Sequence, residues 1–151
     1  MYLHEEGKND PLSSEPLQQK AMEILRLVRA LHDAAQADDT DLTEDTELMM
    51  EREALDILMG NALLIPGKIR ANIQVEAYWL RMENAVLIKR AAMEIQSMVH
   101  QLLFRHPDWQ DYADMIIEEV EQFRGLFINW VGRFDSSIDP DDGWGLFDRN
   151  T

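Results

Sequence analysis

The sequence predicts an all-α protein, an antiparallel up-down four-helix bundle, and three observations lead to this fold class. Hydrophobic residues recur three and four residues apart through four long segments, which is the spacing of amphipathic helices. Glycine and proline are scarce, with seven and five in 151 residues, which disfavours a turn-rich β architecture. Short connections separate the four segments, and consecutive helices joined by short loops pack antiparallel.

The length of 151 residues is typical of one domain, and the chain divides into three parts. We expect a flexible, polar N-terminal segment over residues 1–14, because it is polar and contains proline and serine. The four-helix bundle is predicted over residues 15–134. An acidic tail that contains aromatic residues occupies residues 135–151.

The first predicted helix begins near Ser14 and Glu15, either of which can cap it, and Pro16 suits its first turn. Its apolar stripe continues to Ala35 and stops in an acidic loop over residues 38–41. The second helix is predicted from Thr43 and is ended or kinked at Pro66, because proline lacks the N–H that continues a helix.

The third predicted helix is the longest and runs from about Lys68 to Phe104. At about 1.5 Å per residue it would be roughly 50 Å long, so we expect a kink or break within it. Pro107 separates it from the fourth helix, which carries the clearest stripe in the chain. The members of that stripe are Trp109, Tyr112, Ile116, Val120, Phe123, Phe127, Trp130 and Phe134.

The chain contains no cysteine, which excludes disulfides, thiol catalysis and iron–sulfur sites and favours a reducing compartment. The first sixteen residues have neither the basic start nor the apolar stretch of a secretory signal. The longest apolar run is far too short to span a membrane. We therefore expect a cytoplasmic protein with no membrane contact.

The formal net charge of −15 is spread unevenly along the chain. Residues 1–60 carry five basic and fifteen acidic side chains, and residues 108–151 carry three and eleven. Residues 61–107 reverse this balance, with six basic and three acidic side chains. Most of the surface would repel a polyanion, so nucleic acid is an unlikely partner on charge alone.

Several short apolar stretches resemble a known family. Residues 62–71, ALLIPGKIRA, are similar to the A-x-x-I-P-x-x-I-x-E region of the four-helix-bundle family labelled S23-type ribosomal protein, which includes retroelement accessory proteins. Residues 21–24, AMEI, and 91–95, AAMEI, resemble two further patterns of that family. Residues 141–147, DDGWGLF, resemble the ends of some bacterial four-helix-bundle proteins.

The resemblance covers most of residues 17–134 and implies a four-helix bundle and, more weakly, assembly into a pentamer. It implies no catalytic residue, because the family has no enzymatic motif. The family's accessory proteins are basic and engage nucleic acid and a reverse transcriptase. This chain is acidic, and Arg70, Ala71 and Asn72 occupy the place of the family's glutamate and glycine, so that activity is not carried over.

No catalytic, cofactor or metal motif is found in the sequence. Bundles can hold metals with Glu-x-x-His pairs, and none occurs here. Phosphate-binding glycine loops, hydrolase elbows and kinase signatures are also missing. We therefore expect no catalytic residues, no metal and no cofactor.

One group of polar residues in the third predicted helix is a candidate buried site. Glu76 and Glu83 share a helix face, and Glu83 and Asn84 flank the apolar stripe, where Arg81, Lys89 or Arg90 could pair with them. A register-fixing polar core layer formed by Glu76, Glu83, Asn84 and Arg90 is the favoured interpretation. A polar pocket with an acid–base pair is the alternative.

The basic residues of the same region could form a second kind of site. They are Lys68, Arg70, Arg81, Lys89, Arg90 and Arg105. Pairing with the acidic helices, within the chain or between subunits, is favoured over contact with nucleic acid, because these residues are few and scattered.

The acidic tail contains Trp144, Leu146 and Phe147, an uncommon combination of apolar residues within an acidic segment. They could dock in a partner's groove as a short linear motif does, or fold back over the end of the bundle. The second predicted helix is also apolar on more than one side, which indicates a subunit interface.

These patterns lead us to expect a non-enzymatic interaction or scaffold protein that forms a homo-oligomer through the second and third predicted helices, with an unidentified protein partner. The alternative is a nucleic-acid-associated accessory protein that uses the basic face of the third helix. An enzyme with a polar site near Glu83 ranks third.

Overall fold

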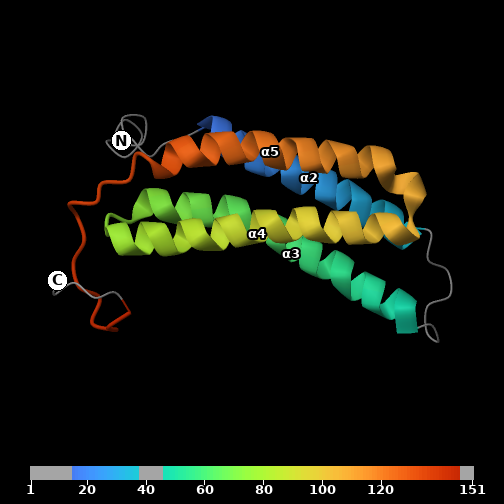
Figure 1. The fold of residues 1–151 in the computed structure, drawn as a ribbon, viewed down its shortest axis with the longest axis horizontal. Coiled ribbons are helices and arrows are strands. Elements are labelled where there is room, and N and C mark those ends of the chain that lie inside the picture. The colour runs from blue at the N-terminus through green and yellow to red at the C-terminus, as the bar shows by residue number, and fades with distance from the viewer. Residues whose placement is uncertain (1–14, 38–45, 147–151) are drawn as a thin grey trace, which may run out of the picture.

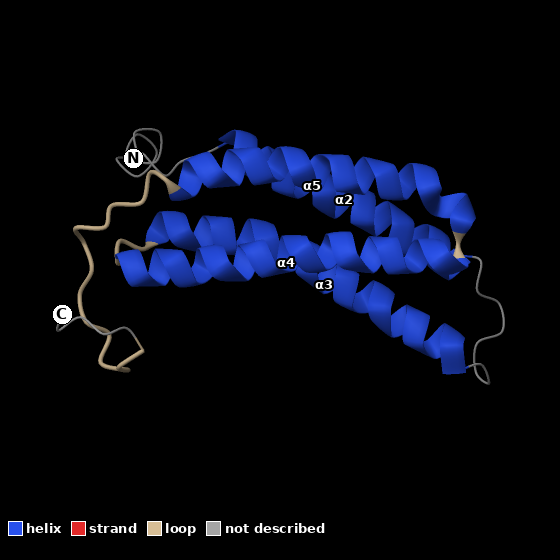
Figure 2. Cartoon of the chain, in the orientation of Figure 1, coloured by secondary structure: helices blue, strands red, loops and turns tan. Residues whose placement is uncertain are grey.

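The computed structural model describes residues 15–37 and 46–146, and helices account for most of this part of the chain (Figures 1 and 2). The predicted four-helix bundle is confirmed. In chain order the elements are α2 (Glu15–Ala37), α3 (Thr46–Gln74), α4 (Tyr78–Arg105), the 3₁₀ turn η1 (Pro107–Trp109) and α5 (Gln110–Val131). Segment 1–14, the acidic loop over 38–41, the predicted start at Thr43 and the tail residue Phe147 lie outside the described residues.

The four helices form a closed ring in which each packs against two neighbours. α3 packs most extensively on α4, α2 contacts α3 and α5, and α4 contacts α5. The contact between α2 and α5 closes the ring, and Figure 1 shows these two helices side by side. None of the helices in the described part of the chain is long and apolar enough to cross a membrane.

Most of the core is made by the apolar stripes that the sequence predicts, although Tyr112 of the predicted fourth stripe is 41% exposed. α2 buries Leu17, Ala21, Ile24, Leu25, Val28, Leu31 and Ala35. α5 buries Ile116, Val120, Phe123 and Trp130, and Phe134 beyond its end is also buried. Trp130 is completely buried and meets the ring of Phe134 edge to face, with centroids 4.9 Å apart. This aromatic pair closes the core where α5 ends.

The predicted boundary between the second and third helices is wrong. Pro66 neither ends nor separates a helix, because α3 continues through it to Gln74. The proline costs one backbone hydrogen bond. Its side chain is buried in the core, and its carbonyl accepts a hydrogen bond from Gln18 Nε2 on α2, at 3.4 Å. Packing against α2 therefore keeps this proline inside the helix.

The break expected in the long third helix lies at residues 75–77, between α3 and α4. These three residues form the turn of an αα-hairpin and contain neither glycine nor proline. Their conformation is held instead by polar side chains from both helices, which are described below.

At the other end of the bundle, the N-terminal part of α3 diverges from the remaining helices (Figure 1). Met49 and Met50 in this part are 58% and 65% exposed. The divergence leaves a pocket of about 620 Å³ between α3 and α4, lined by Glu47, Met50, Glu51, Ala54, Met98, Gln101, Leu102 and Arg105.

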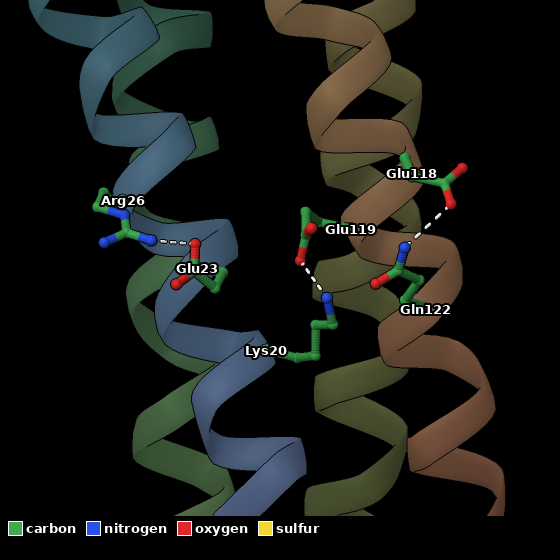
Figure 3. A network of polar contacts seen from close by, with 6 residues as sticks. All are labelled: Lys20, Glu23, Arg26, Glu118, Glu119 and Gln122. Carbon is green, nitrogen blue, oxygen red and sulfur yellow. Dashed lines mark hydrogen bonds and ion pairs between the residues drawn. The ribbon is translucent and has the colours of Figure 1, made fainter.

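Ion pairs on the outside connect helices that are distant in sequence. Lys20 Nζ on α2 lies 2.8 Å from Glu119 Oε2 on α5, and both side chains are only about a quarter exposed (Figure 3). Two other contacts each stay within a single helix: Glu23 with Arg26 on α2, and Glu118 with Gln122 on α5. Only the first pair joins the two helices that close the ring.

Replacement of Trp130 by alanine should destabilise the fold by about 3–5 kcal/mol, because it removes a completely buried indole and leaves a cavity. Urea denaturation followed by circular dichroism measures the change. Met115, on the same helix and 53% exposed, is the matched control, and its replacement by alanine should change stability by no more than about 0.5 kcal/mol. Equal effects of the two variants would contradict this assignment of the core.

Candidate functional site

The turn between α3 and α4 holds a buried polar network. Asn84 Nδ2 donates to Asn72 Oδ1 at 2.8 Å, and Asn72 Nδ2 donates to the carbonyl of Arg81 at 2.9 Å. Arg81 Nε in turn donates to the carbonyl of Val75 at 2.7 Å. Each bond joins one side of the turn to the other. The network therefore fixes the register in which α3 and α4 pair.

This network contains only part of the predicted polar core layer. Asn84 is buried as expected, and Arg81 is buried beside it. Glu76 and Arg90 are exposed and Glu83 is only half-buried, so the predicted grouping of all four residues is wrong. Glu76 is in the turn itself, and Arg90 lies on the outward side of α4, where water solvates a charge at little cost.

Sequence reasoning missed Asn72, although a signal was present. The buried stripe of α3 passes through Leu58, Ala62, Ile65 and Ile69 at alternating spacings of four and three. The next position in that series is 72, so the asparagine occupies a core position. A buried amide needs hydrogen-bond partners, and Asn84 is the residue that supplies one.

The hydrogen bonds of this network indicate a structural role, which is to hold α3 and α4 together at the turn. The two amides bond to each other, Asn72 and Arg81 each donate to a backbone carbonyl, and no carboxylate takes part in these three hydrogen bonds. Neither Glu83 nor Asn84 lines either of the two pockets described here. The arrangement lacks the acid–base pair that the alternative interpretation of this region requires.

A second polar contact lies at the opposite end of α4. The carboxylate of Glu51 on α3 is 8% exposed and pairs with Nε2 of His106, which caps α4. The imidazole stacks on Trp109 with ring centroids 3.7 Å apart. Arg105 also contacts Glu47 through the carboxylate, at 3.6 Å, and the backbone carbonyl, at 3.3 Å. These contacts attach the diverging part of α3 to the end of α4.

A groove of about 440 Å³ lies between α4 and α5. Its apolar lining consists of Ala92, Met93, Val120, Phe123, Phe127 and Ile128, and its polar lining of Lys89, Gln96, Glu121 and Arg124. Glu121 accepts a hydrogen bond from Gln96 at 2.9 Å and pairs with Arg124 at 3.5 Å. The size is within the range of about 300–1,000 Å³ that is usual for ligand pockets. We call this feature the α4–α5 groove.

The six basic residues considered from the sequence do not form one surface. Arg81 is buried in the turn and Arg105 contacts Glu47. Arg70, Lys89 and Arg90 are exposed. Two of the six side chains are therefore engaged within the chain, but only Arg105 pairs with an acidic residue of another helix, as was expected, whereas Arg81 bonds to the backbone carbonyl of Val75.

The start of the tail is attached to the bundle. The carbonyl of Ile138 accepts a hydrogen bond from the backbone N–H of Tyr78, the first residue of α4, at 2.6 Å. Asp135 Oδ1 accepts hydrogen bonds from the hydroxyl and the N–H of Ser137, at 2.6 and 3.0 Å. The Ser137 hydroxyl, then its N–H, and the charge of Arg81 lower the pKa of Asp135 below 3.8.

Beyond Ile138 the tail leaves the bundle. Trp144 is 86% exposed and Leu146 is 69% exposed, so these side chains do not cover the end of the bundle. Two local turns shape this segment, because Asp141 accepts from the N–H of Gly143 and Asp142 from that of Trp144. These are the predicted tail residues that the structure describes.

Among residues 15–37 and 46–146, no three His, Asp or Glu side chains lie together as metal ligands would. No protein family, no curated protein and no solved structure was found to match the chain.

The asparagine pair can be tested by a double-mutant cycle. Asn72→Ala and Asn84→Ala should each destabilise the fold by about 1–3 kcal/mol, because each leaves a buried polar atom of the other amide without its partner. The double variant should lose less than the sum of the single losses, by at least about 0.5 kcal/mol. Asn129→Ala, at an exposed position on α5, is the control and should be near neutral. Additive losses would show that the two side chains act independently.

The Asp135 turn predicts a pH dependence of defined sign. Because the folded pKa is below 3.8, the contact stabilises the tail anchor above that pH and is lost as the pH falls through the folded value. Ser137→Ala should raise the pKa of Asp135 toward 3.8, as measured by NMR titration of the side-chain carboxyl carbon. Ser136→Ala is the control, and an unchanged Asp135 pKa in Ser137→Ala would refute the assignment.

Proposed function

We propose that this chain is a non-enzymatic interaction protein that assembles with further copies of itself through α3 and α4. The observation that carries the proposal is the apolar surface on the outward sides of these two helices. We call it the α3–α4 face, and its members are Met49, Met50, Ile57, Leu63, Val86, Leu87 and Phe104.

The exposure of these side chains is large for a monomer. Ile57 and Leu63 are each 49% exposed, Val86 is 48% exposed and Phe104 is 90% exposed. α3 also buries a full apolar stripe on its opposite side, so the helix is apolar around much of its circumference. A helix that is apolar around much of its circumference is normally covered on more than one side, and the exposed apolar residues of α3 and α4 therefore favour contact with another copy.

The charges of the chain argue against nucleic-acid binding. The net charge of −15 opposes approach to a phosphate backbone, and two of the six basic residues considered are engaged within the fold. The polar network at the α3–α4 turn contains no acid–base pair among its three hydrogen bonds. The family resemblance implies a pentamer, so the mass of the assembly is the quantity to determine.

Sedimentation equilibrium tests the proposal. The full chain should form an oligomer, and Ile57→Glu with Leu63→Glu should lower the mass of that oligomer, because burying two carboxylates in an apolar contact is costly. Circular dichroism should show unchanged helix content, since both side chains are half exposed. Met22→Glu on α2, where the methionine is 46% exposed, is the matched control and should leave the mass unchanged.

A wild-type chain that stays monomeric at several hundred micromolar would overturn the proposal. An oligomer whose mass is unaffected by the double substitution would also overturn the choice of the α3–α4 face as its interface.

A further inference from the structure

The last part of the described tail, residues 139–146, presents two apolar side chains on an acidic, locally ordered segment. Trp144 and Leu146 are two residues apart and both largely exposed. The side chains of Asp141 and Asp142 accept hydrogen bonds from the N–H groups of Gly143 and Trp144, which fixes the backbone at residues 141–144. Gly143 and Gly145 adopt positive φ angles of 79° and 68°. A side chain is strained at such angles, so glycine suits both positions. A preformed segment loses less entropy on binding than a free one.

The α4–α5 groove is apolar and basic, and so complements the apolar side chains and acidic residues of the tail. Its floor is apolar and aromatic, and Lys89 and Arg124 place positive charge at its edge. Lys89 is exposed. An indole and a leucine side chain suit such a floor, while the carboxylates of Asp141 and Asp142 suit a basic edge.

Charge distinguishes this groove from the other pocket. The pocket beside the diverging part of α3 is lined by Glu47 and Glu51 as well as Arg105, so its local charge is negative. An acidic segment would be repelled there. In the α4–α5 groove two basic residues outnumber the single acidic one, Glu121, which already bonds with Gln96 and Arg124.

The direction of the tail indicates which molecule supplies it. The hydrogen bond from Tyr78 to Ile138 holds the tail over the start of α4. From there the tail continues away from α5 and ends on the far side of α4 (Figure 1). It thus leads away from the groove of its own bundle, and its apolar side chains face outward, where another copy can reach them.

We infer that the tail of one copy docks in the α4–α5 groove of a second copy, with Trp144 and Leu146 on the apolar floor and Asp141 and Asp142 near Lys89 and Arg124. The contact joins two different surfaces, so it links subunits head to tail. This inference rests on the proposed self-assembly and deepens it. The contact uses the residues that line the α4–α5 groove and none of the residues of the α3–α4 face, so each contact can exist without the other.

A fluorescently labelled synthetic peptide of residues 139–151 tests the docking. The receptor is the full chain carrying Trp144→Ala, so that its own tail does not compete. Binding followed by anisotropy should be saturable and should weaken as salt is raised. Ile128→Glu and Lys89→Glu in the receptor should each weaken it by at least about tenfold.

Matched controls separate the groove from general charge and folding effects. Arg90→Glu changes the same charge at the neighbouring position, outside the groove lining, and should alter the affinity by less than about twofold. A peptide with both Trp144→Ala and Leu146→Ala should not bind. Absence of saturable binding, or equal binding by the Ile128→Glu receptor, would overturn the inference.

A mixing experiment tests whether the tail acts between copies. Two full-length chains are prepared, one with Trp144→Ala and one with Ile128→Glu, and both also carry Ile57→Glu and Leu63→Glu to remove the α3–α4 face. Neither should associate alone, but their mixture should form a complex by sedimentation, since one supplies an intact tail and the other an intact groove.

The two proposals fail differently in these experiments. If the mixture forms no complex although the peptide binds, a tail that is attached to its bundle does not reach the groove of another copy, and docking between copies is wrong. If the complex forms while the α3–α4 substitutions leave the wild-type mass unchanged, the tail contact is upheld and the α3–α4 interface is refuted.

Discussion

The antiparallel pairing of α3 and α4 depends on two asparagines that bond to each other inside the core. A slip of one residue between these helices would leave the amides of Asn72 and Asn84 buried without partners, at a cost that an apolar pair would not incur. Arg81 adds a bond across the same turn. The register of this hairpin then places the apolar stripe of α4 against α5, and so positions the rest of the ring.

The opposite end of the α3–α4 hairpin is not held by a comparable network of buried amides among the described residues. There α3 diverges, and the contacts that connect it to α4 are ionic: Glu51 with His106, and Glu47 with Arg105. The Glu47–Arg105 pair is exposed, and an exposed ion pair fixes geometry less strongly than a satisfied buried network. α3 and α4 are consequently close together at the turn and apart at the other end (Figure 1). The apolar residues Met49 and Met50 of the diverging part of α3 remain in contact with water.

The distribution of charge gives the two apolar surfaces different expected partners. The chain as a whole is strongly acidic. Along the sequence, the basic segment 61–107 stands between the acidic segments 1–60 and 108–151. The α4–α5 groove draws Lys89 from that middle segment and Arg124 from α5, so it is a locally basic site on an acidic molecule. An acidic tail complements it, whereas the α3–α4 face offers mainly apolar contact.

The sequence by itself determined the helix count, the core stripe of α2 and most of the core stripe of α5, because periodic burial on one face depends only on local spacing. Tertiary packing decided the rest. Pro66 stays helical because α2 packs against it, and the turn at residues 75–77 forms because Asn72 and Arg81 bond across it. Glu76 and Arg90 remain in water while Asn84 is buried. Such outcomes depend on which helix faces meet, and spacing along one helix carries no information about its neighbours.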